Sequence, residues 1–491
     1  MPEGLVCRAR ASRIVCGVML MAFDPTATTD QRLSRRDVLR LGGVALGGLA
    51  LGALAACAAP QSPQPAAKPT TSGPASAAGG FDWQRFKGQS ITVLNVQNSR
   101  TELMTRYQPE FEELTGIKVN ADVLPEQQQR QKLLIEFSSG NPSFDVTTLS
   151  WHVLKGVAAK GKWFADVREW LNDASMTAPD YEAADFSQAA MTYATQKDGS
   201  MDTLPLQIDY WILYWNKELF QKKSLAFPNT LDEVLKAAEA LHDPGNRVYG
   251  FVGRGLKNAN VPVWTAFMQG WDVDPIDRTT NQLRTSGEEA VAAARVYQQL
   301  LSKYAPPGVT GFNWNESQTT FSQAGAAMWF DGIGFAAPLE DASKSRVKGK
   351  VGYGLQPGGP KGRFAATFGD GMGVVRASKK QGPAYLYAQW ATNKKNQARM
   401  LAAGAASPAR LSAYSDPEAK ANMQVPQEWV DTLVASGKIG RPGLPEIEPV
   451  TEFRDTFGIA LTNMIGGADP KAELDKATAD FKPVLDKSLQ G

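Results

Sequence analysis

The stretch "ITVLNVQNSRTELMTRYQPEFEELTGIKVNADVLP", residues 91–125, carries the pattern that decides the fold class. Residues 91–96 are β-formers with a period-two component, which predicts a strand that runs into polar residues. Residues 102–115 predict a helix that stops at Gly116, although Pro109 lies inside it. A second strand is expected over 117–125. Because strand and helix alternate in this way, the sequence predicts an α/β sheet with helices on its faces.

Two later segments predict helices more clearly. Thr230 and Glu233 have the spacing of a capping box, in front of "VLKAAEALH". Residues 287–304 repeat apolar side chains on one helical face, which indicates a stripe buried in the core. The residues of this stripe are Ala290, Ala293, Ala294, Tyr297, Leu300, Leu301 and Tyr304.

Residues 34–57, "SRRDVLRLGGVALGGLALGALAAC", have the three-part layout of a cleavable export signal. The apolar run over 41–56 has 16 residues, fewer than the roughly 20 that a membrane-spanning helix needs. Arg35 and Arg36 stand where a twin-arginine signal has its paired cations. The segment ends in a sequence that resembles a lipoprotein box, so we expect Cys57 to be lipidated and to become the mature N-terminus.

Cleavage before Cys57 would leave 435 residues, enough for two or three domains. Residues 1–56, the expected signal, contain seven arginines and four acidic residues, so their removal changes the formal charge from +2 to about −1. A neutral chain without a basic cluster argues against nucleic acid as a partner. Cys7 and Cys16 would leave with the signal, so no disulfide is expected. Residues 57–80, rich in Ala, Pro, Ser and Thr, are expected to form a disordered tether.

Six segments in a fixed order resemble one known family. They are the opening stretch at 91–125, "SSGNPSFDVTTLSWHVLKGVAAKGKWFADVREWL" at 138–171, "LPLQIDYWILYWNKELF" at 204–220, "FSQAGAAMWFDG" at 321–332, "GDGMGVVRASKKQGPAYLYAQWAT" at 369–392 and "GAASPARLSAY" at 404–414. Together they resemble the family 1 extracellular solute-binding proteins of ABC importers, especially those for carbohydrates. The resemblance runs from about Ser90 to the C-terminus.

This resemblance implies a two-lobed, type II periplasmic-binding-protein fold, with several crossings between the lobes and a ligand cleft between them. The N-terminal lobe is expected over 81–204 and 355–393, and the C-terminal lobe over 205–354 and 394–491. The implied protein is a monomeric binding protein, not an enzyme, and needs no cofactor. It would be lipid-anchored on the outer face of the cytoplasmic membrane and would deliver a mono- to oligosaccharide to the permease of an ABC transporter.

Tryptophans at expected loop starts are candidate platforms for a sugar. An aromatic ring offers a flat apolar face to the C–H face of a pyranose, while polar neighbours satisfy its hydroxyls. Trp151, Trp211 and Trp264 follow polar segments in this way, and core packing is the alternative interpretation for each. Three other tryptophans are assigned to the core: Trp163, Trp170 and Trp390.

Further candidates follow the segments that line the cleft in the family. Gln97 and Asn98 end the first strand, where open α/β sheets bind their ligands. Glycines allow the backbone to approach a ligand closely. For each residue a turn, a helix cap or a salt bridge is the alternative role. The remaining candidates are Ser150, Asp209, Tyr210, Asp331, Gly332, Phe335, Gly369, Asp370 and Arg410.

Other functions stay open at the level of the sequence. A sugar hydrolase would need two carboxylates about 5 to 10 Å apart, and Asp209, Asp331 and Asp370 could supply them. The same aspartates with aromatic walls would suit a polyamine, and a phosphodiester is a further alternative ligand. A zinc site rich in His and Cys is excluded, because His152 and His242 are the only histidines. No P-loop is present, so ATP hydrolysis would need another subunit.

Overall fold

The computed structural model describes residues 80–277 and 279–490, which belong to the compact unit from Ser76 to Gly491. The export signal with Arg35 and Arg36, the lipidation site Cys57 and the tether up to residue 79 lie outside the described residues. Among the described helices, none is both long enough and apolar enough to traverse a bilayer.

Eight strands form one sheet in the order β2-β1-β3-β7-β4-β5, with β6 paired to β4 and β8 paired to β7. β1 is parallel to β2 and β3, whereas β7 is antiparallel to β3 and to β4. The sheet is therefore mixed. The strands are β1 Ser90–Val96, β2 Lys118–Leu124, β3 Val146–Ser150, β4 Leu204–Asn216, β5 Met328–Gly332, β6 Val351–Leu355, β7 Ala365–Val374 and β8 Gly440–Pro442.

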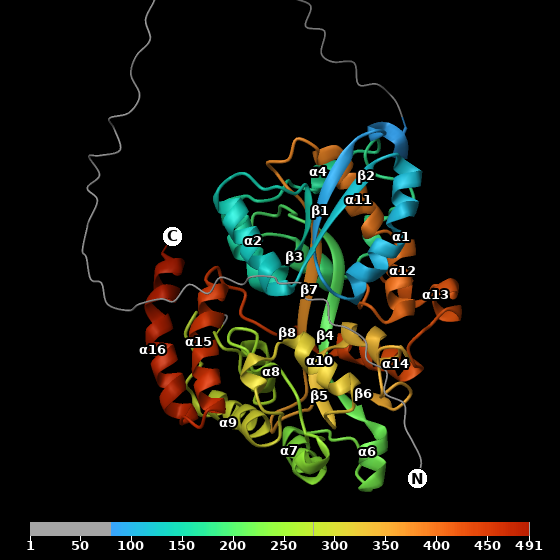
Figure 1. Ribbon diagram of the computed structural model, residues 1–491. Coiled ribbons are helices and arrows are strands. Elements are labelled where there is room, and N and C mark those ends of the chain that lie inside the picture. The colour runs from blue at the N-terminus through green and yellow to red at the C-terminus, as the bar shows by residue number, and fades with distance from the viewer. Residues whose placement is uncertain (1–79, 278, 491) are drawn as a thin grey trace, which may run out of the picture. The chain divides into compact units, whose positions relative to one another are not determined.

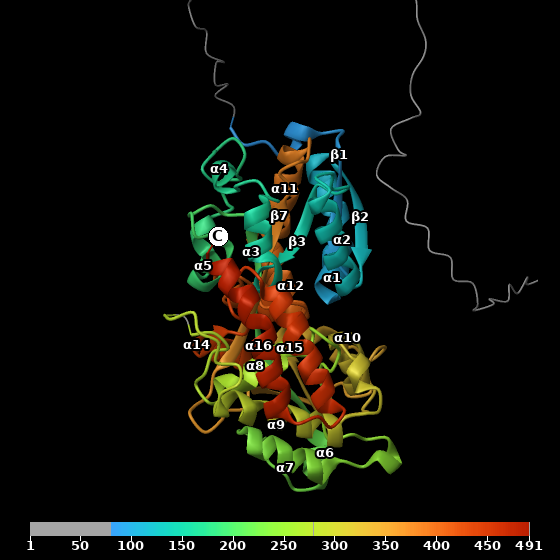
Figure 2. The ribbon, with the colours of Figure 1, turned by 90° about the vertical axis from the view of Figure 1, so that its left-hand side faces the viewer.

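Helices surround the sheet in both halves of Figures 1 and 2. The helices up to residue 269 of the chain are α1 Ser99–Thr115, α2 Glu126–Ser138, α3 Trp151–Gly161, α4 Arg168–Leu171, α5 Gln188–Ala194, α6 Lys217–Lys222, α7 Leu231–Leu241 and α8 Val261–Gln269. The later ones are α9 Glu288–Lys303, α10 Trp314–Ser322, α11 Gln381–Ala391, α12 Lys394–Ala403, α13 Pro417–Ala421, α14 Gln427–Lys438, α15 Val450–Ile465 and α16 Pro470–Leu489.

The local predictions of strand and helix are confirmed. β1, α1 and β2 occupy the predicted stretch, and α1 ends at Gly116, whose φ of 67° is the left-handed conformation that glycine adopts without strain. Thr230 and Glu233 form the reciprocal capping box of α7. The apolar stripe of α9 is buried, apart from Tyr304 at its end, which packs against the same core from a partly buried position.

Three apolar cores organise the elements. The first core draws on residues from 91–208 and 372–409. The second core draws on 211–330, on residues in β7 and on 444–485, and the third on 212–353 and 398–433. Figure 2 shows the elements of the first core above those of the other two.

Two long strands connect the cores. β4 contributes Leu204 and Ile208 to the first core, then Leu213 to the second and Tyr214 to the third. Its first half pairs with β7, and its second half pairs with β5 and β6. β6 pairs with the second half of β4, and the chain then returns to the first core along β7. The junction between the cores therefore lies along β4 and β7.

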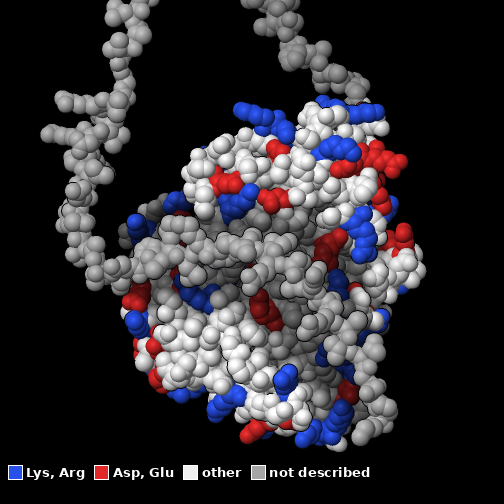
Figure 3. All heavy atoms as spheres, viewed as in Figure 1, with Lys and Arg blue, Asp and Glu red and all other residues white. Residues whose placement is uncertain are grey.

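Charges are mixed on the face drawn in Figure 3, where basic and acidic side chains are interspersed. This distribution agrees with the nearly neutral composition of the chain.

Candidate functional site

A cavity of about 90 Å³ lies where β4 and β7 pass between the cores. Elements of the first core and of the other two cores contribute to its walls. The lining residues are Val96, Asn98, Arg100, Glu126, Arg130, Thr148, Ser150, His152, Gln207, Asp209, Trp211, Arg254, Pro262, Trp314, Phe335, Phe368, Gly369, Asp370 and Arg454.

Half of the candidates from the sequence meet at this cavity. They come from segments that are far apart in the chain, and the mixed sheet brings them together. These residues are Asn98, Ser150, Asp209, Trp211, Phe335, Gly369 and Asp370. Their contact with a ligand remains a prediction.

The structure places the other candidates outside the cavity lining. Trp264 is fully buried in α8, where its indole N–H donates to the carbonyl of Ala290. Arg410 is also fully buried, with its guanidinium between Tyr181 and Phe186. Both side chains serve core packing, and their surroundings explain why they do not reach the cavity. The remaining candidates outside the lining are Gln97, Trp151, Tyr210, Asp331 and Gly332.

Three of these residues do not line the cavity but contact residues that do. Trp151 packs under β7, where a Cβ on Gly369 would come within 2.7 Å of its ring. A Cβ on Gly332 would lie 2.1 Å from a carboxylate oxygen of Asp209, so glycine is needed there. Asp331 binds Arg254 through two contacts of 2.9 and 2.5 Å. These residues therefore shape groups that do line the cavity.

Asp370 is a lining carboxylate that three side chains anchor. One of its oxygens accepts hydrogen bonds from Arg100 at 2.8 Å and from Gln207 at 2.9 Å. The other accepts from the hydroxyl of Ser150 at 2.9 Å. The donors come from α1, β4 and β3, and Asp370 itself lies on β7, so four elements meet at this carboxylate. Such an anchored acceptor can orient a polar ligand without rearranging.

Arg254 joins the charged groups to the aromatic ones. Its guanidinium lies 4.9 Å from the centre of the Trp211 ring, a cation–π distance.

Trp314 stacks on Phe335 with ring centres 4.8 Å apart and planes only 8° from parallel. Trp211, Trp314 and Phe335 all line the cavity. We call the Trp314–Phe335 pair the aromatic wall.

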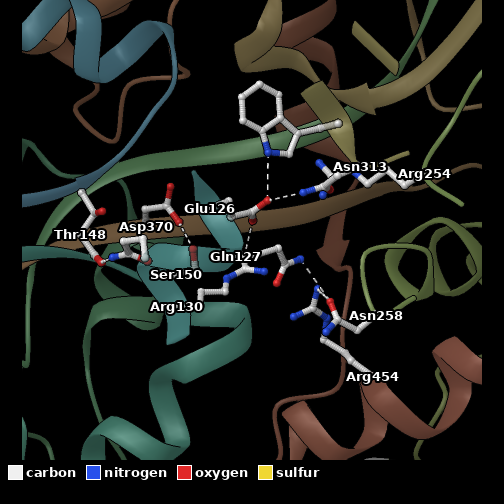
Figure 4. Close-up of polar contacts among 12 residues, drawn as sticks. Glu126, Gln127, Arg130, Thr148, Ser150, Arg254, Asn258, Asn313, Asp370 and Arg454 are labelled. Carbon is white, nitrogen blue, oxygen red and sulfur yellow. Dashed lines mark hydrogen bonds and ion pairs between the residues drawn. The ribbon is translucent and has the colours of Figure 1, made fainter. Parts of the chain in front are cut away.

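Glu126 is a buried carboxylate that sequence reasoning missed. It forms an ion pair with Arg130 at 2.5 Å and accepts hydrogen bonds from the side chains of Asn313 and Trp314, each at 2.9 Å (Figure 4). Burial alone would raise the pKa of Glu126, but the positive charges of Arg130 and Arg254 hold that pKa at about 2. The group is therefore ionised at neutral pH.

Several polar atoms of the lining have no hydrogen-bond partner among the described residues. They are the hydroxyl oxygen of Thr148, Nδ1 of His152 and Nε of Arg454. Burial lowers the pKa of His152 to about 3, so its imidazole is neutral and one ring nitrogen can accept. Buried polar atoms cost free energy unless they are hydrogen-bonded. These atoms can be satisfied by a ligand that both donates and accepts.

Asp209 has an unusual titration. Burial is the main reason why the pKa of Asp209 is raised to about 7, and the negative charges of Asp331 and Asp370 add to this effect. The backbone N–H of Gly334, which donates to the Asp209 carboxylate at 3.1 Å, lowers the pKa and only partly opposes the rise. A carboxyl group with that pKa can act as a hydrogen-bond donor in slightly acidic solution and as an acceptor in basic solution.

This shift predicts a pH-dependent stability. The pKa of Asp209 is higher in the folded protein than in the unfolded chain. The contribution of the protonated Asp209 carboxyl to the free energy of unfolding is therefore complete below about pH 4 and is lost as the pH rises towards 7. We expect the free energy of unfolding of Asp209→Asn, relative to that of the wild type, to rise by roughly 3 kcal/mol between pH 5 and pH 8. Urea unfolding of both proteins at each pH measures this difference. A difference that does not change with pH would contradict the assignment.

The other missed residues belong to strands, helices and loops in which no local pattern indicated that these side chains face a cavity. One signal was present, because Trp314 stands between Asn313 and Asn315, and polar neighbours were part of the reason for choosing the other tryptophans. The missed lining residues are Val96, Arg100, Glu126, Arg130, Thr148, His152, Gln207, Arg254, Pro262, Trp314, Phe368 and Arg454. Within residues 80–277 and 279–490, no group of three or more His, Cys, Asp or Glu side chains could hold a metal ion.

Comparison with known proteins agrees with this architecture. Residues 97–398 match the family described as bacterial extracellular solute-binding protein. The erythritol/L-threitol-binding protein of Mycolicibacterium smegmatis is 26% identical over 427 residues, which cover 82% of this chain and 87% of that protein. The mannitol-binding protein of Pseudomonas aeruginosa is 26% identical over 323 residues, covering 62% of this chain and 69% of its own.

A solved structure confirms the expected α/β fold of the two-lobed solute-binding proteins. A solute-binding protein from Agrobacterium radiobacter, in complex with ribitol, superimposes with a TM-score of 0.73. The two are 24% identical, and the match covers 81% of this chain and 99% of the other.

Proposed function

The chain belongs to the family of bacterial extracellular solute-binding proteins, and we propose that it captures a small neutral carbohydrate or polyol for an ABC importer. Family membership confirms the expectation of a binding protein rather than an enzyme. The ligand would be passed unchanged to permease subunits in the membrane.

The observation that carries this proposal is the chemistry of the cavity. Buried polar atoms without partners stand next to an anchored carboxylate and the aromatic wall. A hydroxyl group both donates and accepts, so a polyhydric ligand can satisfy Thr148, His152 and Arg454 together. Its C–H groups can pack against Trp314. Two relatives are named for polyols, which supports the same class.

The size and charge of the cavity favour a compact, uncharged ligand. Its volume of about 90 Å³ is below the roughly 300–1,000 Å³ of common ligand pockets, so a four- to six-carbon ligand is preferred over an oligosaccharide. Four arginines line it, which disfavours a polyamine. The lining arginines are Arg100, Arg130, Arg254 and Arg454. The carboxylates of Glu126, Asp331 and Asp370 offset most of their charge, which gives an anionic phosphodiester little advantage.

The proposed mechanism is closure of two lobes around the ligand. We assign the first core to one lobe and the second and third cores to the other, with β4 and β7 as the connections. A ligand that touches both lobes only in the closed form shifts the population towards that form through its differential affinity. No covalent step is required.

A thermal-shift screen tests the proposed ligand class. Erythritol, ribitol, D-mannitol and maltose are compared with putrescine and glycerophosphocholine. At one hundred times its Kd, a true ligand stabilises the folded protein by about 2.7 kcal/mol, which raises Tm by a few degrees. We expect the largest shift from a small polyol. A shift with putrescine or glycerophosphocholine alone would reject the proposal.

Export and anchoring complete the proposed function. The family is extracellular, which supports export, while the paired Arg35 and Arg36 and the sequence before Cys57 support a twin-arginine route and a lipid anchor. We expect Cys57→Ser to abolish incorporation of labelled fatty acid and to move the protein from the membrane to the soluble fraction. Equal membrane recovery of variant and wild type would contradict the anchor.

A further inference from the structure

Glu126 connects the two sides of the cavity. It begins α2, a helix that packs on the first core through Leu133. Its hydrogen-bond donors Asn313 and Trp314 begin α10, whose Phe321 is part of the third core. The two contacts of 2.9 Å therefore span the cavity from one proposed lobe to the other. In Figure 1, α2 lies among the elements of the first core and α10 among those below.

The carboxylate is held in position from its own side. Arg130 lies one helical turn further along α2, and its guanidinium pairs with the carboxylate oxygen that does not face Trp314. The exposed fractions of the two side chains are only 11% for Arg130 and 14% for Glu126. Charge-assisted hydrogen bonds in such surroundings are stronger than neutral ones. The protein's own side chains therefore supply every contact of this link across the cavity.

Trp314 is the residue through which this link reaches the binding surface. Its ring stacks on Phe335 and lines the cavity, while its indole N–H donates a hydrogen bond to the carboxylate of Glu126. A ring stacked on one side and hydrogen-bonded at its edge has one orientation. If α2 moves away with the first core, this edge contact is lost.

We propose that Glu126 is a positioning residue that holds the cleft closed before ligand arrives and fixes the aromatic wall from the opposite lobe. The wall is then complete only in the closed form. The apparent Kd of such a protein depends on the fraction of molecules that are already closed, so Glu126 would influence affinity through closure, in addition to any contact that it makes from the cavity lining. The mechanism applies to any small solute and does not depend on the polyol assignment.

The first test measures closure in the ligand-free protein. Spin labels are placed at Ile135 on α2 and Val434 on α14, both exposed, in a background without the three natural cysteines. We expect one narrow distance distribution for wild type, and a longer, broader one for Glu126→Gln. Trp314→Phe keeps a stackable ring but removes the N–H donor, so it should broaden the distribution as well. This second variant keeps the test valid if Glu126→Gln unfolds.

A matched control is available. Glu102 on α1 also forms an ion pair with a residue of the other side, Lys344, at 3.3 Å, but both side chains are more than half exposed. An exposed pair contributes little, so Glu102→Gln should leave the distribution unchanged. Distributions for Glu126→Gln and Trp314→Phe that coincide with that of Glu102→Gln would overturn the proposal.

A double-mutant cycle separates positioning from a general loss of structure. With the polyol that gives the largest thermal shift as the probe, Glu126→Gln and Trp314→Phe should each raise Kd about tenfold. The double variant should be weaker by clearly less than the product of the two single effects, because both variants act on the Trp314–Glu126 hydrogen bond: one replaces its charged acceptor and the other removes its donor. If the increase in Kd of the double variant equals the product of the two single increases, Glu126 and Trp314 are not coupled. If no carbohydrate binds, the proposed function fails, while the distance measurement still decides the role of Glu126.

Discussion

Replacing Asp331 by alanine is expected to lower the free energy of unfolding by about 3–5 kcal/mol. The carboxylate of Asp331 is fully buried, and it is the ion-pair partner of Arg254, whose side chain is 11% exposed. Removing only the acid leaves a buried guanidinium without its counter-charge. That penalty is larger than the net contribution of the intact pair, because the desolvation of Arg254 is no longer compensated.

Urea unfolding of wild type and Asp331→Ala measures this effect. Asp475→Ala is the matched control, because Asp475 pairs with Lys471 one turn away on α16 while about half of each side chain is exposed. We expect the control to change stability by less than about 0.5 kcal/mol. A loss for Asp331→Ala as small as that of the control would show that Arg254 is not held as described.

Replacing Trp314 by alanine is expected to raise the Kd for a small polyol roughly 30-fold, about 2 kcal/mol. The substitution removes the cavity-facing half of the aromatic wall and leaves Phe335 without its stacking partner at 4.8 Å. It also removes one of the two N–H donors that Glu126 binds across the cavity. Affinity should therefore fall through lost contact and through reduced closure.

Trp170→Ala controls for the general cost of losing a half-buried tryptophan. Trp170 packs on Tyr385 with ring centres 5.0 Å apart and does not line the cavity. Isothermal titration calorimetry should give the wild-type Kd for Trp170→Ala and a much weaker one for Trp314→Ala. Equal affinities for the two variants would remove Trp314 from the site.

The parts of the fold that depend on local chemistry could be predicted from the sequence. A helix stop at Gly116 and the capping box at Thr230 depend on residues within four positions of each other. The order of the six family segments added the two-lobed α/β fold class. Two of the candidate residues do meet, since Ser150 at the end of β3 donates its hydroxyl to Asp370 in the middle of β7.

The rest depends on contacts between distant segments. Glu126 and Trp314 are 188 positions apart, and neither segment carries a pattern that refers to the other. Trp264 and Arg410 resembled loop residues in the sequence. However, α8 places Trp264 inside the second core, and the rings of Tyr181 and Phe186 enclose the guanidinium of Arg410. Which side of a helix or loop faces a cavity is decided by packing that a single sequence does not display.

The most direct measurement is calorimetric titration of the purified protein with erythritol, ribitol and D-mannitol, beside putrescine and glycerophosphocholine. We predict that at least one neutral polyol binds at one molecule per chain and is recovered chemically unchanged. Binding of putrescine or glycerophosphocholine with no heat from any carbohydrate, or conversion of the sugar during incubation, would contradict this account of the cavity.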